Sequence, residues 1–328
     1  MTAVPTLEIE DLRVEFVGRD RRLTAIDGVS LQIAAGEVLG LVGESGAGKS
    51  LTGTAITGLL EPPARITRGC IRLDGRRIDN LPDADLRHVR GREIGVVFQD
   101  PLTSLNPLYT IGRQLVETIR THIDVSSAEA RGRAVHLLGQ VGLPEPGKRF
   151  DSFPHEFSGG MRQRVVIALA LCANPRLVIA DEPTTALDVS IQAQITGLLK
   201  RLCRERRSAV LLITHDMGVI AETADRVAVM YAGRIVEIGH VRDVVHSPMH
   251  PYTQGLIASI PRLERRTDRL LQIRGTMPPL GDLPVGCAFH PRCAQVIERC
   301  REQAPHLMRA SGTTTAACWL YGPCHAEN

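Results

Sequence analysis

The chain has 328 residues, of which 43% are hydrophobic and 23% are charged, and its formal net charge is +3. Such a chain can bury a sizeable core, which excludes intrinsic disorder, and its length favours one large domain plus a smaller one. The small net charge and the 3% of aromatic residues argue against a protein that binds nucleic acid through a basic face or by base stacking.

Short apolar β-branched runs at residues 38–42, 177–180 and 210–213 indicate strands that are buried on both faces. Each run is followed by small or polar residues and then by a helical pattern. This alternation predicts an α/β fold with a largely parallel sheet, in which ligands bind beyond the carboxyl ends of the strands.

Helical patterns dominate from about residue 100 to residue 175. A capping-box pattern at residues 126–129 predicts a helix that ends at Gly142, and a second helix is expected from Gly159 to a point before Pro175. The longest apolar run, residues 165–173, has about half the length that a membrane span needs.

A turn at Gly233 separates two β-rich runs, residues 226–231 and 234–238. After Gly239 the sequence becomes richer in His, Pro and Cys. We therefore predict a main domain over residues 1–240 and a small C-terminal domain over residues 241–328.

Residues 43–50 read Gly-Glu-Ser-Gly-Ala-Gly-Lys-Ser and match the phosphate-loop pattern, between the strand at 38–42 and a helical run at 51–60. Glycines let backbone N–H groups converge on phosphate oxygens, and the helix presents its positive end to the same anion. Lys49 is expected to reach the β- and γ-phosphates, and the Ser50 hydroxyl is expected to bind Mg²⁺. The candidate nucleotide-binding residues here are Gly43, Ser45, Gly46, Gly48, Lys49, Ser50 and Leu51.

The strand at residues 177–180 ends in two carboxylates. Asp181 suits a Mg²⁺ ligand at the strand tip, and Glu182 is placed to polarise an attacking water as the catalytic base. With the phosphate loop, this pair predicts hydrolysis of a nucleoside triphosphate.

Ser158, Gly159 and Gly160 stand at the start of the helix expected from Gly159 and form a second anion-binding arrangement. One domain does not need two such sites for a single nucleotide. With Phe157 before it and Met161 after it, the segment resembles the signature motif of ATP-binding cassette proteins, whose usual form is Leu-Ser-Gly-Gly-Gln.

The resemblance extends over residues 1–240 and implies roles for further residues. It implies that Gln99 contacts Mg²⁺ and takes part in catalysis, that Asp188 belongs to the D-loop, that His215 contacts the γ-phosphate, and that Phe16 stacks on adenine. It also implies a P-loop NTPase fold with a RecA-like core, a β-rich N-terminal part and a helical subdomain at about residues 100–175. Two such domains pair head to tail, so that each ATP lies between the phosphate loop of one and the Ser-Gly-Gly of the other.

Residues 97–107, residues 180–194 and the His-Pro-Tyr-Thr of residues 250–253 are similar to the oligopeptide/dipeptide importer branch. The branch implies an ATPase subunit, peripheral to the cytoplasmic face of the plasma membrane, that energises import of dipeptides or oligopeptides. The implied partners are a second ATPase subunit, expected to be a different chain, two transmembrane permease subunits and an extracytoplasmic peptide-binding protein; nucleic acid is not among them.

Alternatives to peptide import remain open. The ATPases of nickel-complex and glutathione importers look alike, so either substrate fits the same motifs. A soluble cassette ATPase of the DNA-repair or translation type is less favoured because the chain has one cassette and no heptad run. A metal-cluster sensor that only binds ATP is less favoured because Glu182 and His215 are both present.

Five of the eight cysteines lie from Cys287 onward. The N-terminal sequence has no secretion-signal pattern, so we expect a reducing cytosolic compartment, where clustered cysteines favour metal over disulfides. Residues 286–293 resemble the C-terminal region of the importer branch, which implies a [4Fe–4S] cluster; zinc is the second reading and buried free thiols are the third. The candidate ligands are Cys287, Cys293, Cys300 and Cys318, with Cys324 or His290 as substitutes.

The remaining features have plainer readings. Cys70, Cys172 and Cys203 are scattered and are expected to pack in the core. The basic stretches at residues 201–207 and 262–269 contain acidic residues, so solvated helix faces are favoured over contact with anionic lipid.

Overall fold

The computed structural model describes residues 4–19, 21–185, 187–260 and 272–321. The chain forms two units: unit 1 contains residues 1–8, 32–38 and 72–213, and unit 2 contains residues 9–31, 39–71 and 214–328. Two of the sequence features, the basic stretch at 262–269 and Cys324, lie outside the described residues.

Unit 1 contains a run of parallel strands, β6 (Ile94–Val97), β7 (Leu177–Asp181) and β8 (Ala209–Thr214). In the register, Val97 lies opposite Ala180, and Asp181 lies opposite Ile213. The two β-branched runs predicted as buried strands are therefore β7 and β8. Because parallel strands end at the same edge, the residues that follow β6 and β7 come together there.

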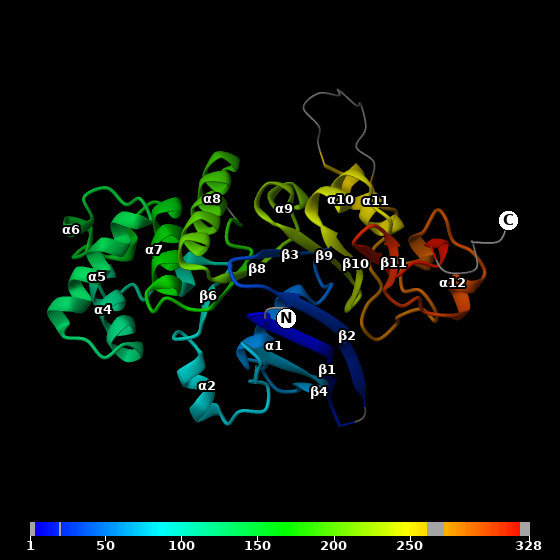
Figure 1. Ribbon diagram of the computed structural model, residues 1–328, viewed down its shortest axis with the longest axis horizontal. Helices are drawn as coiled ribbons and strands as arrows, with labels where there is room; N and C mark the ends of the chain where they lie inside the picture. The colour runs from blue at the N-terminus through cyan, green and yellow to red at the C-terminus, as the bar shows by residue number, and fades with distance from the viewer. Residues whose placement is uncertain (1–3, 20, 186, 261–271, 322–328) are drawn as a thin grey trace. The chain divides into compact units, whose positions relative to one another are not determined.

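Helices cover the other part of unit 1, and Figure 1 shows α4, α5 and α7 grouped together in green. Ser126 caps α5 by accepting a hydrogen bond from the backbone N–H of Glu129 at 3.2 Å, which confirms one half of the predicted capping box. The carboxylate of Glu129 accepts from Arg133 at 2.7 Å. The helices of unit 1 are α2 (Asp83–Val89), α3 (Pro101–Ser104), α4 (Ile111–His122), α5 (Ser127–Gln140), α6 (Pro146–Arg149), η1 (Pro154–Glu156), α7 (Gly159–Leu171) and α8 (Val189–Arg206).

The basic stretch at residues 201–207 is only partly a solvated face. Arg201 pairs with Glu205 at 3.6 Å on the exposed side of α8. Arg206, in contrast, donates to the carbonyl of Leu171 at 2.8 Å and to the side chain of Gln140 at 2.7 Å. It therefore fastens α8 to the ends of α7 and α5.

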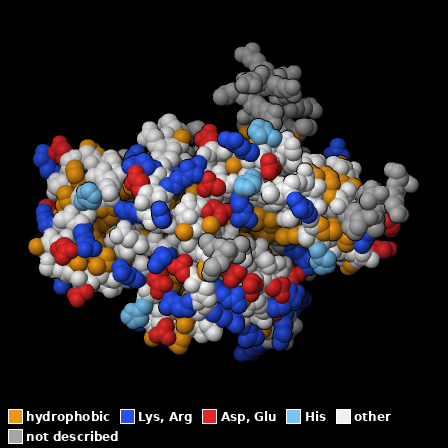
Figure 2. Space-filling view, viewed as in Figure 1, with side chains coloured by type: hydrophobic (Ala, Val, Ile, Leu, Met, Phe, Trp, Pro, Cys, Tyr) orange, Lys and Arg blue, Asp and Glu red, His pale blue; other side chains and the backbone are white. Residues whose placement is uncertain are grey.

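Unit 2 holds most of an N-terminal sheet in which β1 (Leu7–Val17) lies between β2 (Arg22–Ile33) and β4 (Ala64–Leu73). The last residues of β4 pair with β5 (Arg76–Arg77) in unit 1. Figure 2 shows acidic and basic side chains interleaved over this part of the surface. Arg13 donates to Asp27 at 2.9 Å, and Arg68 pairs with Asp11 at 2.7 Å, so the charges there compensate one another.

A second sheet of unit 2 begins with β3 (Val38–Val42), which is buried along its whole length and pairs in parallel with β9 (Arg226–Tyr231). β9 pairs antiparallel with β10 (Arg234–His240), as the sequence predicts. Ala232 and Gly233, the two residues between them, have φ values of 46° and 79°, the left-handed pair typical of tight hairpins.

The C-terminal residues extend this sheet, an arrangement that the sequence did not predict. β12 (Thr314–Ala316) pairs with β10, with Glu237 opposite Ala316, and β11 (Met308–Ser311) pairs with β12. The helices of unit 2 are α1 (Lys49–Thr57), α9 (Met217–Thr223), α10 (Val241–His246), α11 (Pro251–Ala258), η2 (His290–Arg292), α12 (Arg299–Glu302) and η3 (Trp319–Tyr321). In the part of the chain that the structure describes, no helix has the length and apolarity to cross a membrane.

Candidate functional site

The phosphate-loop residues 43–50 connect β3 to α1, as predicted. Gly46 and Gly48 have φ values of 82° and 104°, which only glycine adopts without strain. A Cβ on Gly43 would lie 2.1 Å from the carbonyl oxygen of Met230, so the loop is seated directly against the backbone of β9. The loop therefore has the close backbone approach that its glycines predict.

Lys49 is the first residue of α1 and is only 5% exposed. Its ammonium donates to the carbonyl oxygens of Gly43 at 2.8 Å and Glu44 at 3.0 Å, so the side chain folds back along the loop. Ser50 and Leu51 follow in the first turn of α1, where the positive end of the helix dipole favours an anion.

Gln99 and Glu182 come together in unit 1, because each follows one of two paired parallel strands, β6 and β7. The Gln99 side-chain amide donates to a carboxylate oxygen of Glu182 at 3.1 Å, and the Thr185 hydroxyl donates to the same oxygen at 2.9 Å. Glu182 has a φ of 46°, an uncommon conformation for a residue other than glycine, and its N–H donates to the carbonyl of Ile213 at 2.8 Å. Asp181 ends β7 immediately before it.

Ser158 caps α7, and its hydroxyl accepts from the N–H of Met161 at 3.4 Å. Gly159 and Gly160 form the first turn. A Cβ on Gly160 would lie 3.0 Å from the side chain of Ile191, so this turn packs closely against the start of α8, which Asp188 precedes.

The remaining predicted residues lie at the ends of two strands. Phe16 is half-buried near the end of β1, and His215 follows β8 and is exposed. Phe16, the phosphate loop and His215 belong to unit 2, whereas Gln99, Ser158, Asp181, Glu182 and Asp188 belong to unit 1.

The four candidate cysteine ligands line one small cavity of about 10 Å³ in unit 2, roughly the space that one water molecule needs. Burial raises the pKa of the Cys318 thiol to about 11 and also raises the pKa values of Cys287 and Cys293. His290 turns its Nδ1 to the carbonyl of Cys287 at 3.0 Å.

No metal site is formed by these thiols as the structure places them. Among the described residues, no three His, Cys, Asp or Glu side chains are grouped closely enough to hold a metal ion. The four cysteines that the resemblance implied as ligands thus share one location, but the structure does not support the predicted metal site.

Two of the scattered cysteines, Cys172 and Cys203, are buried in unit 1. Burial raises the pKa of Cys172 and of Cys203 to about 12, which keeps both thiols neutral. Cys70 in unit 2 is also buried, and its Sγ lies 3.3 Å from a carboxylate oxygen of Glu10. The packing role predicted for these three residues fits their burial.

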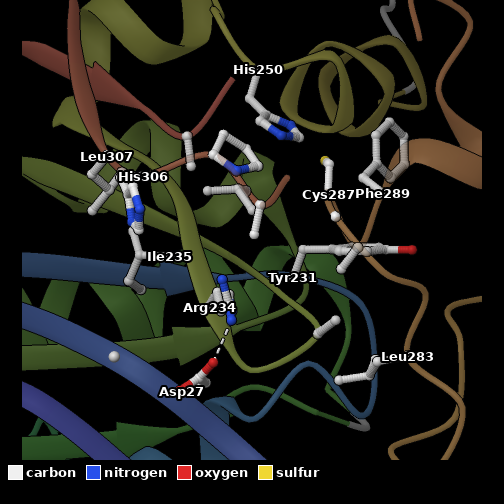
Figure 3. Close-up of a pocket in the computed structure, with 18 of the residues that line it drawn as sticks. Asp27, Tyr231, Arg234, Ile235, His250, Leu283, Cys287, Phe289, His306 and Leu307 are labelled. Atoms are coloured by element: carbon white, nitrogen blue, oxygen red, sulfur yellow. Dashed lines mark hydrogen bonds and ion pairs between the residues drawn. The ribbon is translucent and has the colours of Figure 1, made fainter. Parts of the chain in front are cut away.

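Sequence reasoning missed a pocket of about 580 Å³ in unit 2 (Figure 3). Asp27 lies at one end, where it accepts from Arg13 and Arg234, and His250 and Phe289 lie at the other end. Burial alone would raise the pKa of Asp27, but the two guanidinium groups lower it. No single motif spans this pocket, because its residues come from β1, β2, β4, β9, β10 and the C-terminal segment.

Two known families match parts of the chain. Residues 26–185 match the family described as "ABC transporter", and residues 236–300 match "Oligopeptide/dipeptide transporter, C-terminal region". The first segment contains the phosphate loop, Gln99, the Ser-Gly-Gly at 158–160 and Glu182, and the second begins within β10.

Full-length relatives agree with these matches. The chain is 45% identical over 322 residues to the oligopeptide transport ATP-binding protein AppD of Bacillus subtilis, covering 98% of both proteins. It is 49% identical over 313 residues to OppD of Salmonella typhimurium, covering 95% of this chain and 93% of the relative. It is 44% identical over 307 residues to the dipeptide transport ATP-binding protein DppD of Escherichia coli, covering 93% and 94%.

Among solved structures, a dimeric ATP-binding cassette in a post-hydrolysis state with ADP and Pi is similar to this chain. The TM-score is 0.64 and the identity 30%, with 72% of this chain and 99% of that cassette covered.

Proposed function

Because the chain belongs to the ABC transporter family, in its oligopeptide/dipeptide branch, we propose that it is the ATP-hydrolysing subunit that energises import of dipeptides or oligopeptides. The observation that carries this proposal is the phosphate loop between β3 and α1, with Lys49 folded along it and glycines where a Cβ would clash. The near-complete coverage of peptide-transport ATP-binding relatives supports the choice of substrate class.

The phosphate loop fits a triphosphate, and we assign its residues accordingly. The backbone N–H groups of Gly43, Ser45, Gly46, Gly48 and Leu51 and the ammonium of Lys49 hold the phosphates. Mg²⁺ would be held by oxygen ligands from Ser50, Gln99 and Asp181, and when bound it neutralises charge that develops on the phosphates. Phe16 is assigned to the adenine.

Glu182 is the proposed catalytic base. One oxygen of its carboxylate accepts hydrogen bonds from Gln99 and Thr185, which orient the group that is to accept a proton from water. His215 is assigned to the γ-phosphate. Ser158, Gly159, Gly160 and Asp188 are assigned to the nucleotide of a paired cassette, as the head-to-tail arrangement of the family implies.

Replacing Glu182 with Gln tests this assignment because the amide keeps the shape of the side chain and cannot take up a proton. ATP turnover is expected to fall at least about 100-fold, with ATP binding retained. Glu117→Gln, at an exposed position of α4, is the matched control. Turnover in Glu182→Gln equal to that of the control would contradict the role of the base.

We propose that the transporter also contains two permease subunits, an extracytoplasmic peptide-binding protein and a second, different ATPase subunit, with this chain peripheral to the cytoplasmic face of the membrane. Residues 1–240 then form the ATPase domain and residues 241–328 the C-terminal domain.

Uptake of a labelled dipeptide by vesicles that contain the assembled transporter tests the substrate. Uptake of a nickel chelate or of glutathione in place of dipeptide would select the alternative; a nucleic-acid-stimulated ATPase without membrane partners would overturn import itself.

A separate proposal concerns Cys287, Cys293, Cys300 and Cys318. We propose that they hold a [4Fe–4S] cluster, with zinc as the second choice; the support is that all four line one cavity. The thiols would have to move closer together to bind it. Iron content and visible absorbance of anaerobically purified protein test the cluster, zinc content tests the alternative, and protein free of both metals would leave the cysteines as buried thiols.

A further inference from the structure

Three sequence motifs of unit 2 meet at one residue of the phosphate loop, Glu44. The backbone N–H of Glu44 donates to the hydroxyl oxygen of Tyr252, from the His-Pro-Tyr-Thr motif, at 2.8 Å. The carboxylate of Glu44 accepts from Arg292, which precedes Cys293 in the cysteine motif, at 3.0 Å. The loop is thus held from the C-terminal region both by its backbone and by a charged side chain.

The side chain of Arg292 is held in one orientation, because its guanidinium donates hydrogen bonds to four residues. Besides Glu44, it donates to the carbonyls of Arg274 at 2.9 Å and Gly275 at 3.1 Å and to the hydroxyl of Tyr231 at 3.4 Å. Its side chain is only 7% exposed. Such a fork needs the planar guanidinium, so lysine cannot reproduce the same set of bonds.

Tyr252 and Arg292, the two residues that hold Glu44, pack against aromatic rings. The ring centroids of Tyr231 and Tyr252 lie 4.7 Å apart, and Phe289 lies 5.3 Å from the first ring and 5.4 Å from the second. Figure 3 shows Tyr231 and Phe289 side by side at the end of the pocket. The rings restrict the positions of the Tyr252 hydroxyl and of Arg292, which lies over two of them.

The C-terminal region also lies along the outside of the loop. A cavity of about 610 Å³ is lined by Glu44 and Ser45 of the loop together with Gly275, Met277 and Arg292. A Cβ on Gly46 would lie 3.0 Å from the terminal methyl of Met277. The phosphate loop is therefore in contact with residues of the C-terminal region, which are far from it in the sequence but belong to the same unit.

The charge of Glu44 gives these contacts a consequence for nucleotide binding. A carboxylate in a phosphate-binding loop repels a triphosphate, and Arg292 compensates that charge where it arises. We propose that Arg292 and Tyr252 are positioning residues through which the C-terminal region sets the affinity of the phosphate loop for ATP. The proposal rests on ATP binding alone and is independent of which solute the transporter carries.

The test is the dissociation constant of ATP, measured by equilibrium titration of the full-length chain. Arg292→Ala is expected to weaken ATP binding about tenfold and to raise KM for ATP with kcat at saturating ATP unchanged, since a charge-assisted bond is lost. The ATP affinity of Arg292→Lys is expected to lie between that of the original chain and that of Arg292→Ala. In the Arg292→Ala/Glu44→Gln double variant most of the affinity returns, because the uncompensated carboxylate is gone.

Arg299→Ala is the matched control, because Arg299 stacks on Trp319 at 3.6 Å in the same C-terminal region. The proposal is overturned if Arg292→Ala binds ATP as tightly as the original chain, if Arg299→Ala loses as much affinity, or if Glu44→Gln restores none of it. Should Arg292→Ala fail to fold, Tyr252→Phe removes only the hydroxyl that accepts from the loop, and it is expected to weaken ATP binding several-fold; unchanged affinity there overturns the proposal too.

Discussion

Glu237 of β10 is a buried carboxylate whose replacement by Gln offers a test of how the His-Pro-Tyr-Thr segment is attached. Its side chain is fully buried, with 0% exposure. One carboxylate oxygen accepts from the backbone N–H of Met249 and the other accepts from that of His250, each at 2.8 Å. Burial raises the pKa of Glu237, and these two donors act in the opposite direction.

The size of the effect follows from the two donors. Gln has the same shape but offers one oxygen and one NH₂ group, so one backbone N–H must face another donor. Loss of one charge-assisted hydrogen bond in a buried place costs about 1.5–3 kcal/mol, so we expect Glu237→Gln to lower the free energy of unfolding by about 2 kcal/mol. Tyr252 lies just beyond this attachment, so its hold on the phosphate loop should loosen as well.

Urea denaturation of the full-length chain, followed by circular dichroism, measures the change. With a slope of about 2 kcal/mol/M, the midpoint should fall by about 1 M. Glu302→Gln, at an exposed position of α12, is the matched control and should leave the midpoint unchanged. A midpoint for Glu237→Gln equal to that of the control would refute the reasoning, because the buried donors would then be satisfied without the carboxylate.

Two further predictions concern other parts of the chain. Burial, with smaller contributions from the charges of Arg92 and His88, lowers the pKa of His122 below 6.5. The stability that the neutral ring provides is therefore present above pH 6.5 and is lost as the pH falls through the pKa of the folded state. In the original chain the urea midpoint should fall between about pH 7 and pH 5, and His122→Gln should make this fall smaller. An equal fall of the midpoint in His122→Gln would contradict the prediction. Gly43→Ala would place a Cβ 2.1 Å from the backbone oxygen of Met230, so ATP binding in an equilibrium titration should be lost, and retained affinity would mean that the loop can shift.

The buried parallel strands were predictable from sequence because their signal is local. The β-branched run at residues 38–42 is β3, and the run at 177–180 is β7 without its final Asp181. Both faces of each strand are covered, so apolar residues occupy every position and alternation is absent. The carboxylate at the end of β7 and the glutamine after β6 then meet because parallel strands end at one edge.

The contacts that link the C-terminal region to the phosphate loop were not predictable in this way. Glu44 and Arg292 are separated by 248 positions, and neither stands in a periodic pattern that indicates a partner. β12 is short and polar, so only its pairing with β10 identifies it as a strand. The left-handed φ of Glu182 depends on the packing around the end of β7, which sequence spacing does not specify.

The pairing of β12 with β10 has a practical consequence for anyone who wishes to study the ATPase alone. A fragment that stops after His240 would lack β12 and would leave the side of β10 around Glu237 as an open strand edge. Unpaired backbone donors and acceptors on such an edge recruit strands from other molecules. The shortened protein should therefore self-associate at concentrations where the whole chain does not, and light scattering on the two side by side would reveal it; equal scattering would mean that the edge is harmless.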